Sequence, residues 1–131
     1  SNQLLGAADL SVNITDITFN NSNPIENEEI MVNATIHNLG DLATTNVKVQ
    51  FLENGTEIMN KTININVFSF NNTHVNWTVK IGPRNFEVKV DPDNLISESS
   101  EINNNASKNN SINARKLNKD TFKPVATWDN S

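Results

Sequence analysis

The sequence predicts an all-β fold, an antiparallel β-sandwich of about seven strands. Apolar residues alternate with polar ones in short runs through most of the chain, which is the period of a strand with one buried face. Turn-forming residues separate these runs, and no stretch between them has helical spacing. The chain has 131 residues, 36% of them hydrophobic, which is enough for one core and one domain.

Six alternating runs precede an acidic segment, and each predicts a strand. Their inward residues, in chain order, are Leu10, Val12 and Ile14; Ile30, Val32, Ala34 and Ile36; Val47, Val49 and Phe51; Ile63, Ile65 and Val67; Val75, Trp77 and Val79; Phe86, Val88 and Val90. A seventh strand, polar and typical of a sheet edge, is predicted from Asn104 to about Ile112, where Ala106 and Ile112 share one parity.

The predicted turns fit antiparallel pairing. Asn54-Gly55 suits a type I′ hairpin, because both residues tolerate positive φ. Gly82-Pro83 predicts another reversal, and Asn38-Leu39-Gly40 ends the second strand with residues that can enter left-handed conformations. Asp91-Pro92-Asp93-Asn94 reads as a tight turn, because Asp accepts backbone N–H groups and Pro presets φ.

Short strands with frequent turns imply two packed sheets of immunoglobulin-like type. The chain has no Cys, so disulfides and thiolate metal sites are excluded and core packing alone must hold the sheets together. Trp77 is the predicted centre of that core.

Charge and hydropathy limit the partners. The net charge of -5 and pI near 4.9 argue against nucleic acid or an anionic membrane, both of which need a basic face. No apolar run approaches the roughly 20 residues of a membrane helix, and no leader opens the chain, so no membrane insertion is expected. The two ends suggest a piece of a longer protein.

Several of these segments together resemble the CARDB family, a cell adhesion related domain found in bacteria and archaea. The matching segments are Asp9-Leu10-Ser11-Val12, Asn23-Pro24 with Glu28, Asn38-x-Gly40, the Asn54-Gly55 hairpin, and the closing run with Asp91, Glu98, Glu101 and Asn103-Asn104. The resemblance covers about residues 9–112 and implies a non-catalytic module of a larger exported protein. Asn27 stands where the family often has Gly, so a different kink is expected there.

Asparagine is unusually frequent: 26 of 131 residues, with nine Asn-x-Ser/Thr triplets where composition alone predicts about four. The triplets begin at Asn13, Asn20, Asn33, Asn54, Asn60, Asn71, Asn76, Asn105 and Asn109. Polar strand positions hold Asn13, Asn33 and Asn76, and predicted turns or loops hold Asn20, Asn54, Asn60 and Asn71. The best placed are the loop acceptors Asn20, Asn54 and Asn71. An Asn-rich composition could create the triplets by itself, but their excess favours an exported glycoprotein.

The acidic segment offers a candidate calcium site. Its hard oxygen donors are Asp91, Asp93, Glu98 and Glu101. Their spacing lacks the alternation of a calcium loop, so the sequence favours turn caps and solvated charge, and no cofactor is expected.

No catalytic constellation is present, and the sequence predicts a non-enzyme. His37 and His74 are the two histidines, and neither has a nucleophile beside it in the sequence. A glycan-binding site would need exposed aromatic faces. Trp77 has the inward parity of a core residue, and Phe68 and Phe70 are predicted to pack beneath a loop.

The sequence divides into a starting segment or linker at residues 1–8, the sandwich at 9–112, and a tail at 113–131. The tail carries basic Arg115, Lys116, Lys119 and Lys123, and apolar Phe122, Val125 and Trp128. A linker to a following module is favoured over a functional arm.

The prediction is therefore a structural or adhesive module of an exported, extracellular or cell-surface protein. The loops near residues 20–28, 39–46, 68–74 and 91–103 would meet other surface proteins or polysaccharide, besides neighbouring domains of the same chain. The alternatives are a glycan-binding accessory domain of a secreted enzyme and a calcium-rigidified spacer.

Overall fold

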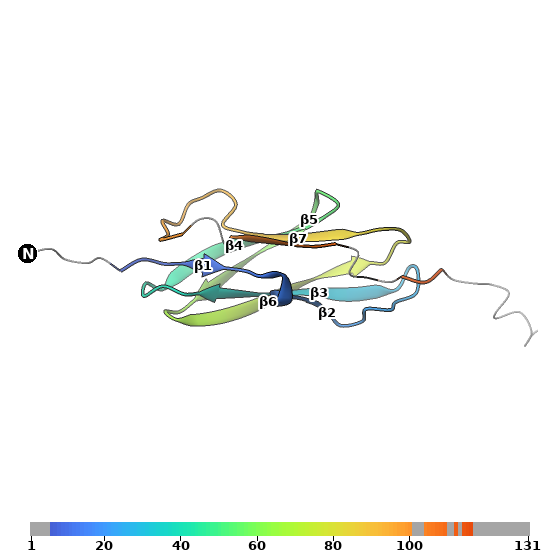
Figure 1. Cartoon of the computed structure of the whole chain (residues 1–131), viewed down its shortest axis with the longest axis horizontal. Helices are drawn as coiled ribbons and strands as arrows, with labels where there is room; N and C mark the ends of the chain where they lie inside the picture. The colour runs from blue at the N-terminus through green and yellow to red at the C-terminus, as the bar shows by residue number, and fades with distance from the viewer. Residues whose placement is uncertain (1–5, 101–103, 110–111, 113, 117–131) are drawn as a thin grey trace, which may run out of the picture.

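The protein is a sandwich of two antiparallel sheets, seen edge-on in Figure 1. The computed structural model describes residues 6–100, 104–109, 112 and 114–116. The first sheet contains β1 (Leu10–Ser11), β2 (Ile17–Phe19), β3 (Glu29–Asn38) and β6 (Ser69–Thr78). The second contains β4 (Thr44–Glu53), β5 (Thr56–Ile65), β7 (Asn85–Val90) and β8 (Asn105–Asn109), in the order β5-β4-β7-β8.

The eight strand segments fill seven strand positions. β6 pairs with one edge of β3 along its whole length, so β1 and β2 must both pair with the other edge. They are two pieces of one edge strand, separated by the 3-10 turn η1 (Ile14–Asp16). The predicted sandwich is confirmed, including β8 as an edge strand. None of the helical structure in the described residues is long and apolar enough to cross a membrane.

The first predicted strand was wrong at Ile14. Leu10 and Val12 are buried, but Ile14 is exposed because the chain leaves the sheet in η1. That turn closes on itself: the Asn13 N–H donates to a carboxylate oxygen of Asp16 at 2.8 Å, and the Asp16 N–H donates to the Asn13 carbonyl at 2.9 Å. Ile17 then takes the next buried position, in a strand that alternation did not reveal.

The other predicted inward residues form the core, with two exceptions at the end of β5. Ile63 is half-buried and Val67 lies exposed in the turn after the strand. Trp77 is only 5% exposed, and its ring meets Phe86 edge-on at a centroid distance of 5.0 Å. Phe19 also meets Phe86 edge-on, at 5.2 Å, so edge-to-face contacts of three aromatic rings join both sheets. The prediction of Trp77 as a core residue is confirmed.

The turns follow the predictions in part. Asn54 and Gly55 have φ of 48° and 84°, as a type I′ hairpin between β4 and β5 requires. Gly82-Pro83 is a crossover from β6 to β7 in the other sheet, not a hairpin. Asn38 and Gly40 do not have positive φ, so their role is different from the predicted one. Asn27 has φ of 75°, a backbone shape that Gly adopts readily.

Little of the predicted tail is described. Arg115 forms a parallel bridge with Ile25, and its N–H donates to the Pro24 carbonyl at 2.8 Å. Residues 114–116 therefore lie against the loop before β3. The rest of the tail, together with Glu101, Asn103 and the side chain of Asn109, lies outside the described residues.

Candidate functional site

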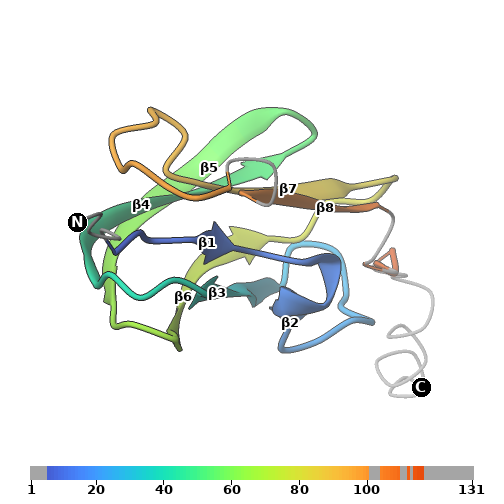
Figure 2. The same cartoon turned by 60° about the vertical axis from the view of Figure 1, so that its left-hand side comes forward.

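Three loops meet at one end of the sandwich, around residues 7–9 (Figure 2). They are the β3–β4 loop at 39–43, the β5–β6 turn at 66–68 and the loop at 91–100 that follows β7. The Phe68 N–H donates to the Gly40 carbonyl at 3.1 Å. The N–H groups of Asp41 and Ser99 donate to Ala7 and Ala8, each at 3.0 Å. We call this region the loop end.

Asn38 holds the β3–β4 loop in shape. Its side chain is fully buried, and its carbonyl oxygen accepts the N–H groups of Asp9 and Gly40 at 3.1 and 3.0 Å. Its amide donates to the Leu42 carbonyl at 2.8 Å. A Cβ on Gly40 would lie 2.0 Å from the Ala7 carbonyl oxygen, so the close approach of two backbones requires Gly here.

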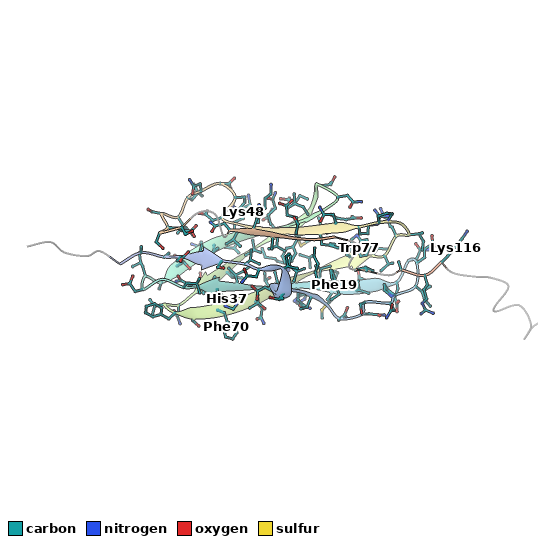
Figure 3. The ribbon with its side chains drawn as sticks, in the orientation of Figure 1. Phe19, His37, Lys48, Phe70, Trp77 and Lys116 are labelled. Atoms are coloured by element: carbon teal, nitrogen blue, oxygen red, sulfur yellow. The ribbon has the colours of Figure 1, made fainter. Side chains whose placement is uncertain are left out.

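The loop end exposes apolar side chains. Phe68 is 72% exposed and has φ of 51°, a left-handed conformation that bulky residues rarely adopt. Phe70 is 60% exposed, with its ring 5.9 Å from that of His37 (Figure 3). The prediction that both pack beneath a loop was wrong, because each points away from the core. Three further apolar residues are exposed nearby: Leu39 and Leu42 in the β3–β4 loop, and Val67 in the β5–β6 turn. We call these five residues the apolar cluster.

The acidic turn is folded around a buried carboxylate. Asp91 is 6% exposed, and its two carboxylate oxygens accept the N–H groups of Leu95 and Ile96 at 3.0 and 2.9 Å. The Asn94 N–H donates to the Asp91 carbonyl at 2.9 Å, which closes the predicted tight turn. Asp91 therefore acts as a turn cap, as the sequence predicted.

The other acidic side chains have separate partners. One oxygen of Glu98 accepts the Leu10 N–H at 2.8 Å, and the other accepts the Asn104 amide at 2.7 Å. Asp93 forms an exposed ion pair with Lys48 at 3.2 Å. Within the described part of the chain, no three acidic, His or Cys side chains gather where a cation could be held. Asp91, Asp93 and Glu98 thus each have their own partners within the domain.

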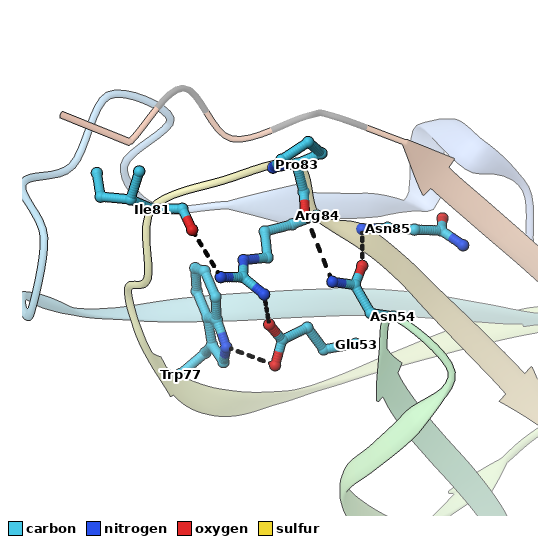
Figure 4. Close-up of polar contacts among 7 residues, drawn as sticks. All are labelled: Glu53, Asn54, Trp77, Ile81, Pro83, Arg84 and Asn85. Carbon is cyan, nitrogen blue, oxygen red and sulfur yellow. Dashed lines mark hydrogen bonds and ion pairs between the residues drawn. The ribbon is translucent and has the colours of Figure 1, made fainter. Parts of the chain in front are cut away.

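The opposite end carries a polar cluster that the sequence did not reveal (Figure 4). Glu53 accepts the Trp77 indole N–H at 3.1 Å and an Arg84 N–H at 2.9 Å, through different carboxylate oxygens. Arg84 also donates to the Ile81 carbonyl at 2.8 Å and lies 6.0 Å from the Trp77 ring centroid. Asn54 accepts the Asn85 N–H at 2.8 Å. We call this end the clasp end.

The four predicted binding loops do not act as one surface. The loop at 20–28 lies at the clasp end, where the Asn27 N–H donates to Val79 at 2.9 Å. Most of 68–74 is part of strand β6, and residues 44–46 belong to β4. Of the described residues in these predicted loops, 39–43, Phe68 and 91–100 lie together at the loop end.

The histidines lie on the outer face of the first sheet. The His37 Nε2 atom is 3.0 Å from an Asp16 carboxylate oxygen, so the side chain ties η1 to β3. His74 is exposed on β6, opposite Asn33. Neither position forms part of the loop end's apolar cluster, although His37 borders it through Phe70.

The described glycosylation acceptors are all at least partly accessible. The exposed ones are Asn13, Asn20, Asn54, Asn60, Asn76 and Asn105, and the half-buried ones are Asn33 and Asn71. Three predicted positions were wrong: Asn60 lies within β5 and Asn71 within β6, not in loops, and Asn13 precedes η1 and is not in a strand. Asn71 shares the inward parity of Val75, and its amide donates to the Asn64 carbonyl at 2.9 Å.

Comparison with solved structures finds the same fold in three prokaryotic proteins. A CARDB domain from Pyrococcus furiosus, solved in complex with di-metal ions, is 24% identical, with a TM-score of 0.75 over 88% of this chain and 100% of that one. A domain of a predicted cell-surface protein from Methanosarcina acetivorans is 23% identical, with a TM-score of 0.67 over 81% and 92%. A Geobacter metallireducens protein is 30% identical, with a TM-score of 0.57 over 71% and 88%.

Comparison with curated protein sequences finds no match. The CARDB family model matches residues 7–108, which is most of the chain and nearly the whole sandwich. The chain belongs to the CARDB family.

Proposed function

We propose that this domain is a non-catalytic adhesive module of an exported surface protein, and that its loop end binds a protein partner. The observation that carries the proposal is Phe68, an aromatic side chain held exposed in a left-handed turn. Such a conformation costs free energy, and strained backbone is characteristic of functional positions. Since Phe68 fills no space in the core, folding does not require an aromatic residue there.

The surroundings of Phe68 support binding. The apolar cluster has Leu39 and Leu42 on the β3–β4 loop, Val67 and Phe68 on the β5–β6 turn, and Phe70 at the start of β6. The bond from the Phe68 N–H to the Gly40 carbonyl joins the turn to the loop. Contiguous exposed apolar surface marks interaction sites, and aromatic anchors dominate the binding energy of protein interfaces. Asn38 and Gly40 fix the shape of the β3–β4 loop, so little conformational entropy would be lost on binding.

A protein partner fits this surface better than polysaccharide. Leu39, Leu42 and Val67 have no hydrogen-bonding groups for sugar hydroxyls. The carboxylates of Asp41, Asp91 and Glu98 at this end already accept hydrogen bonds within the domain. The exported location is supported by family membership and by the similar fold of the Methanosarcina acetivorans domain.

The proposal is tested with the domain coupled to beads and incubated with intact cells of the native host. We expect the beads to bind, and a Phe68→Ala/Phe70→Ala double variant to bind at least tenfold less with an unchanged melting temperature. Protease treatment of the cells should abolish binding, whereas periodate oxidation of surface glycans should not. Equal binding by the double variant would contradict the proposal, and loss of binding only after periodate would identify a polysaccharide partner.

A further inference from the structure

Strand β6 is a long sheet edge without the usual protection. It has ten residues, pairs with β3 in unbroken register, and has no partner strand on its other side among the described residues. Edge strands offer unpaired N–H and C=O groups to other chains, and proteins blunt them with charges, Pro or bulges. β6 contains no Lys, Arg, Asp, Glu or Pro, and its pairing shows no bulge. Its free edge is therefore open to strand addition.

The other edges are protected by their own residues or shape. β5 carries Glu57 and Lys61 and pairs with β4 through two register shifts. β8 has five residues, and its Lys108 reaches across to the Ile17 carbonyl at 2.7 Å. The remaining edge is broken into β1 and β2 by η1. β6 alone among the described edges combines length and regular pairing with the absence of Lys, Arg, Asp and Glu.

An accessible glycosylation acceptor lies on this edge. Asn76 is exposed on the outer face of β6, opposite Met31. Trp77 points inward, so Asn76 and Thr78, the two residues that define the triplet, both lie exposed on the same face. Asn71, the other acceptor of β6, is half-buried and its amide is already donating to Asn64. Asn76 is therefore the acceptor that an enzyme can reach on this strand.

We propose that Asn76 carries an N-linked glycan that prevents another strand from pairing with β6. The Asn76 amide nitrogen forms a bond with the anomeric carbon of a phosphate-linked oligosaccharide donor. The bond from that carbon to the phosphate oxygen breaks, the phosphate leaves with the electron pair, and the amide loses one proton. A strand added to β6 would lie about 4.8 Å away, within the volume of a glycan on the outer face. This proposal depends on the proposed function in one respect, which is that the domain is exported.

The first test is site-resolved mass spectrometry of protein purified from the native host. The tryptic peptide between Lys61 and Lys80 contains both Asn71 and Asn76, so fragmentation must assign the modified residue. We expect a glycan on Asn76 and at least tenfold lower occupancy of Asn71. An unmodified Asn76 would overturn the proposal while leaving adhesion through the loop end unaffected.

The second test compares variants produced in the same host. Asn76→Gln and Thr78→Val each remove the triplet, and we expect the mass of both variants to fall by one glycan. After incubation at high concentration, the monomer fraction of each should be at least threefold lower than that of the wild type. Asn72→Gln changes an exposed non-acceptor on the same strand and face, and Thr78→Ser keeps the triplet; both should stay monomeric. Loss of the glycan with the monomer fraction unchanged in both triplet variants would overturn the shielding role.

Discussion

The two ends of the sandwich are built in opposite ways. At the clasp end, Glu53 accepts hydrogen bonds from Trp77 and Arg84 in a partly buried network. At the loop end, the buried Asn38 side chain shapes the backbone, and the β3–β4 loop and the β5–β6 turn expose apolar side chains beside polar ones such as Asp41. The first arrangement stabilises the fold, whereas the second presents a surface. We infer that stability and binding are separated along the long axis of the domain.

The largest expected loss of stability comes from removing the Glu53 carboxylate at the clasp end. Glu53→Ala leaves the Arg84 guanidinium and the Trp77 indole N–H without their acceptor, in a pair whose side chains are each only 17% exposed. We expect the free energy of unfolding to fall by about 3 kcal/mol, because a charge remains unpaired in a mostly buried site. Urea denaturation measures it. Glu57→Ala, at an exposed position on the other strand of the same hairpin, should change it by less than about 0.5 kcal/mol.

Removing the buried Asn38 side chain at the loop end should lower the free energy of unfolding by less. Asn38→Ala removes three hydrogen bonds and leaves the Asp9 and Gly40 N–H groups unsatisfied. We expect a loss of about 2 kcal/mol in the free energy of unfolding, together with weaker cell binding, because the β3–β4 loop loses its shape. A destabilised variant that binds cells at the wild-type level would show that Asn38 does not shape a binding surface.

The acidic turn gives a smaller, calcium-independent effect. Asp91→Ala removes the acceptor of two backbone N–H groups and should lower the free energy of unfolding by about 1–2 kcal/mol with or without calcium. Millimolar calcium should leave the wild-type melting temperature unchanged, since binding to the folded state alone would raise it. A calcium-dependent increase that Asp91→Ala abolishes would show that this turn is a metal site.

The smallest effect has the opposite sign. Phe68→Asn should raise the free energy of unfolding by about 0.5–1 kcal/mol, because Asn tolerates the left-handed conformation that strains Phe. The same variant should bind cells more weakly. Calorimetry and the bead assay together would then show that this residue is retained for binding at the expense of stability. A destabilised Phe68→Asn protein would mean that the Phe68 ring supports the fold.

Much of the fold could be predicted because alternation reports burial directly. Ile30 to Ile36 and Phe86 to Val90 follow strict period two, and both became central strands. β2 was missed because η1 changes the parity between Val12 and Ile17. The hairpin at Asn54-Gly55 was predictable because its chemistry is local.

The two ends were less predictable because they depend on long-range contacts. Nothing near Glu53 in the sequence indicates that Arg84 lies beside it, 31 residues later. For the apolar cluster a signal did exist: Val67 and Phe68 are consecutive apolar residues that interrupt alternation just before Phe70. Successive side chains of a regular strand point to opposite faces, so a regular strand with one buried face would expose one of the pair.

The separation of stability from binding is tested most directly by placing the same charge at each end. Phe68→Asp and Ile81→Asp each replace an exposed apolar side chain, the first at the loop end and the second at the clasp end, where only the Ile81 backbone carbonyl takes part in the network. Binding of both variants to native-host cells would be measured beside the wild type. The account predicts at least a tenfold loss for Phe68→Asp and wild-type binding for Ile81→Asp. Equal losses, or a loss for Ile81→Asp alone, would contradict it.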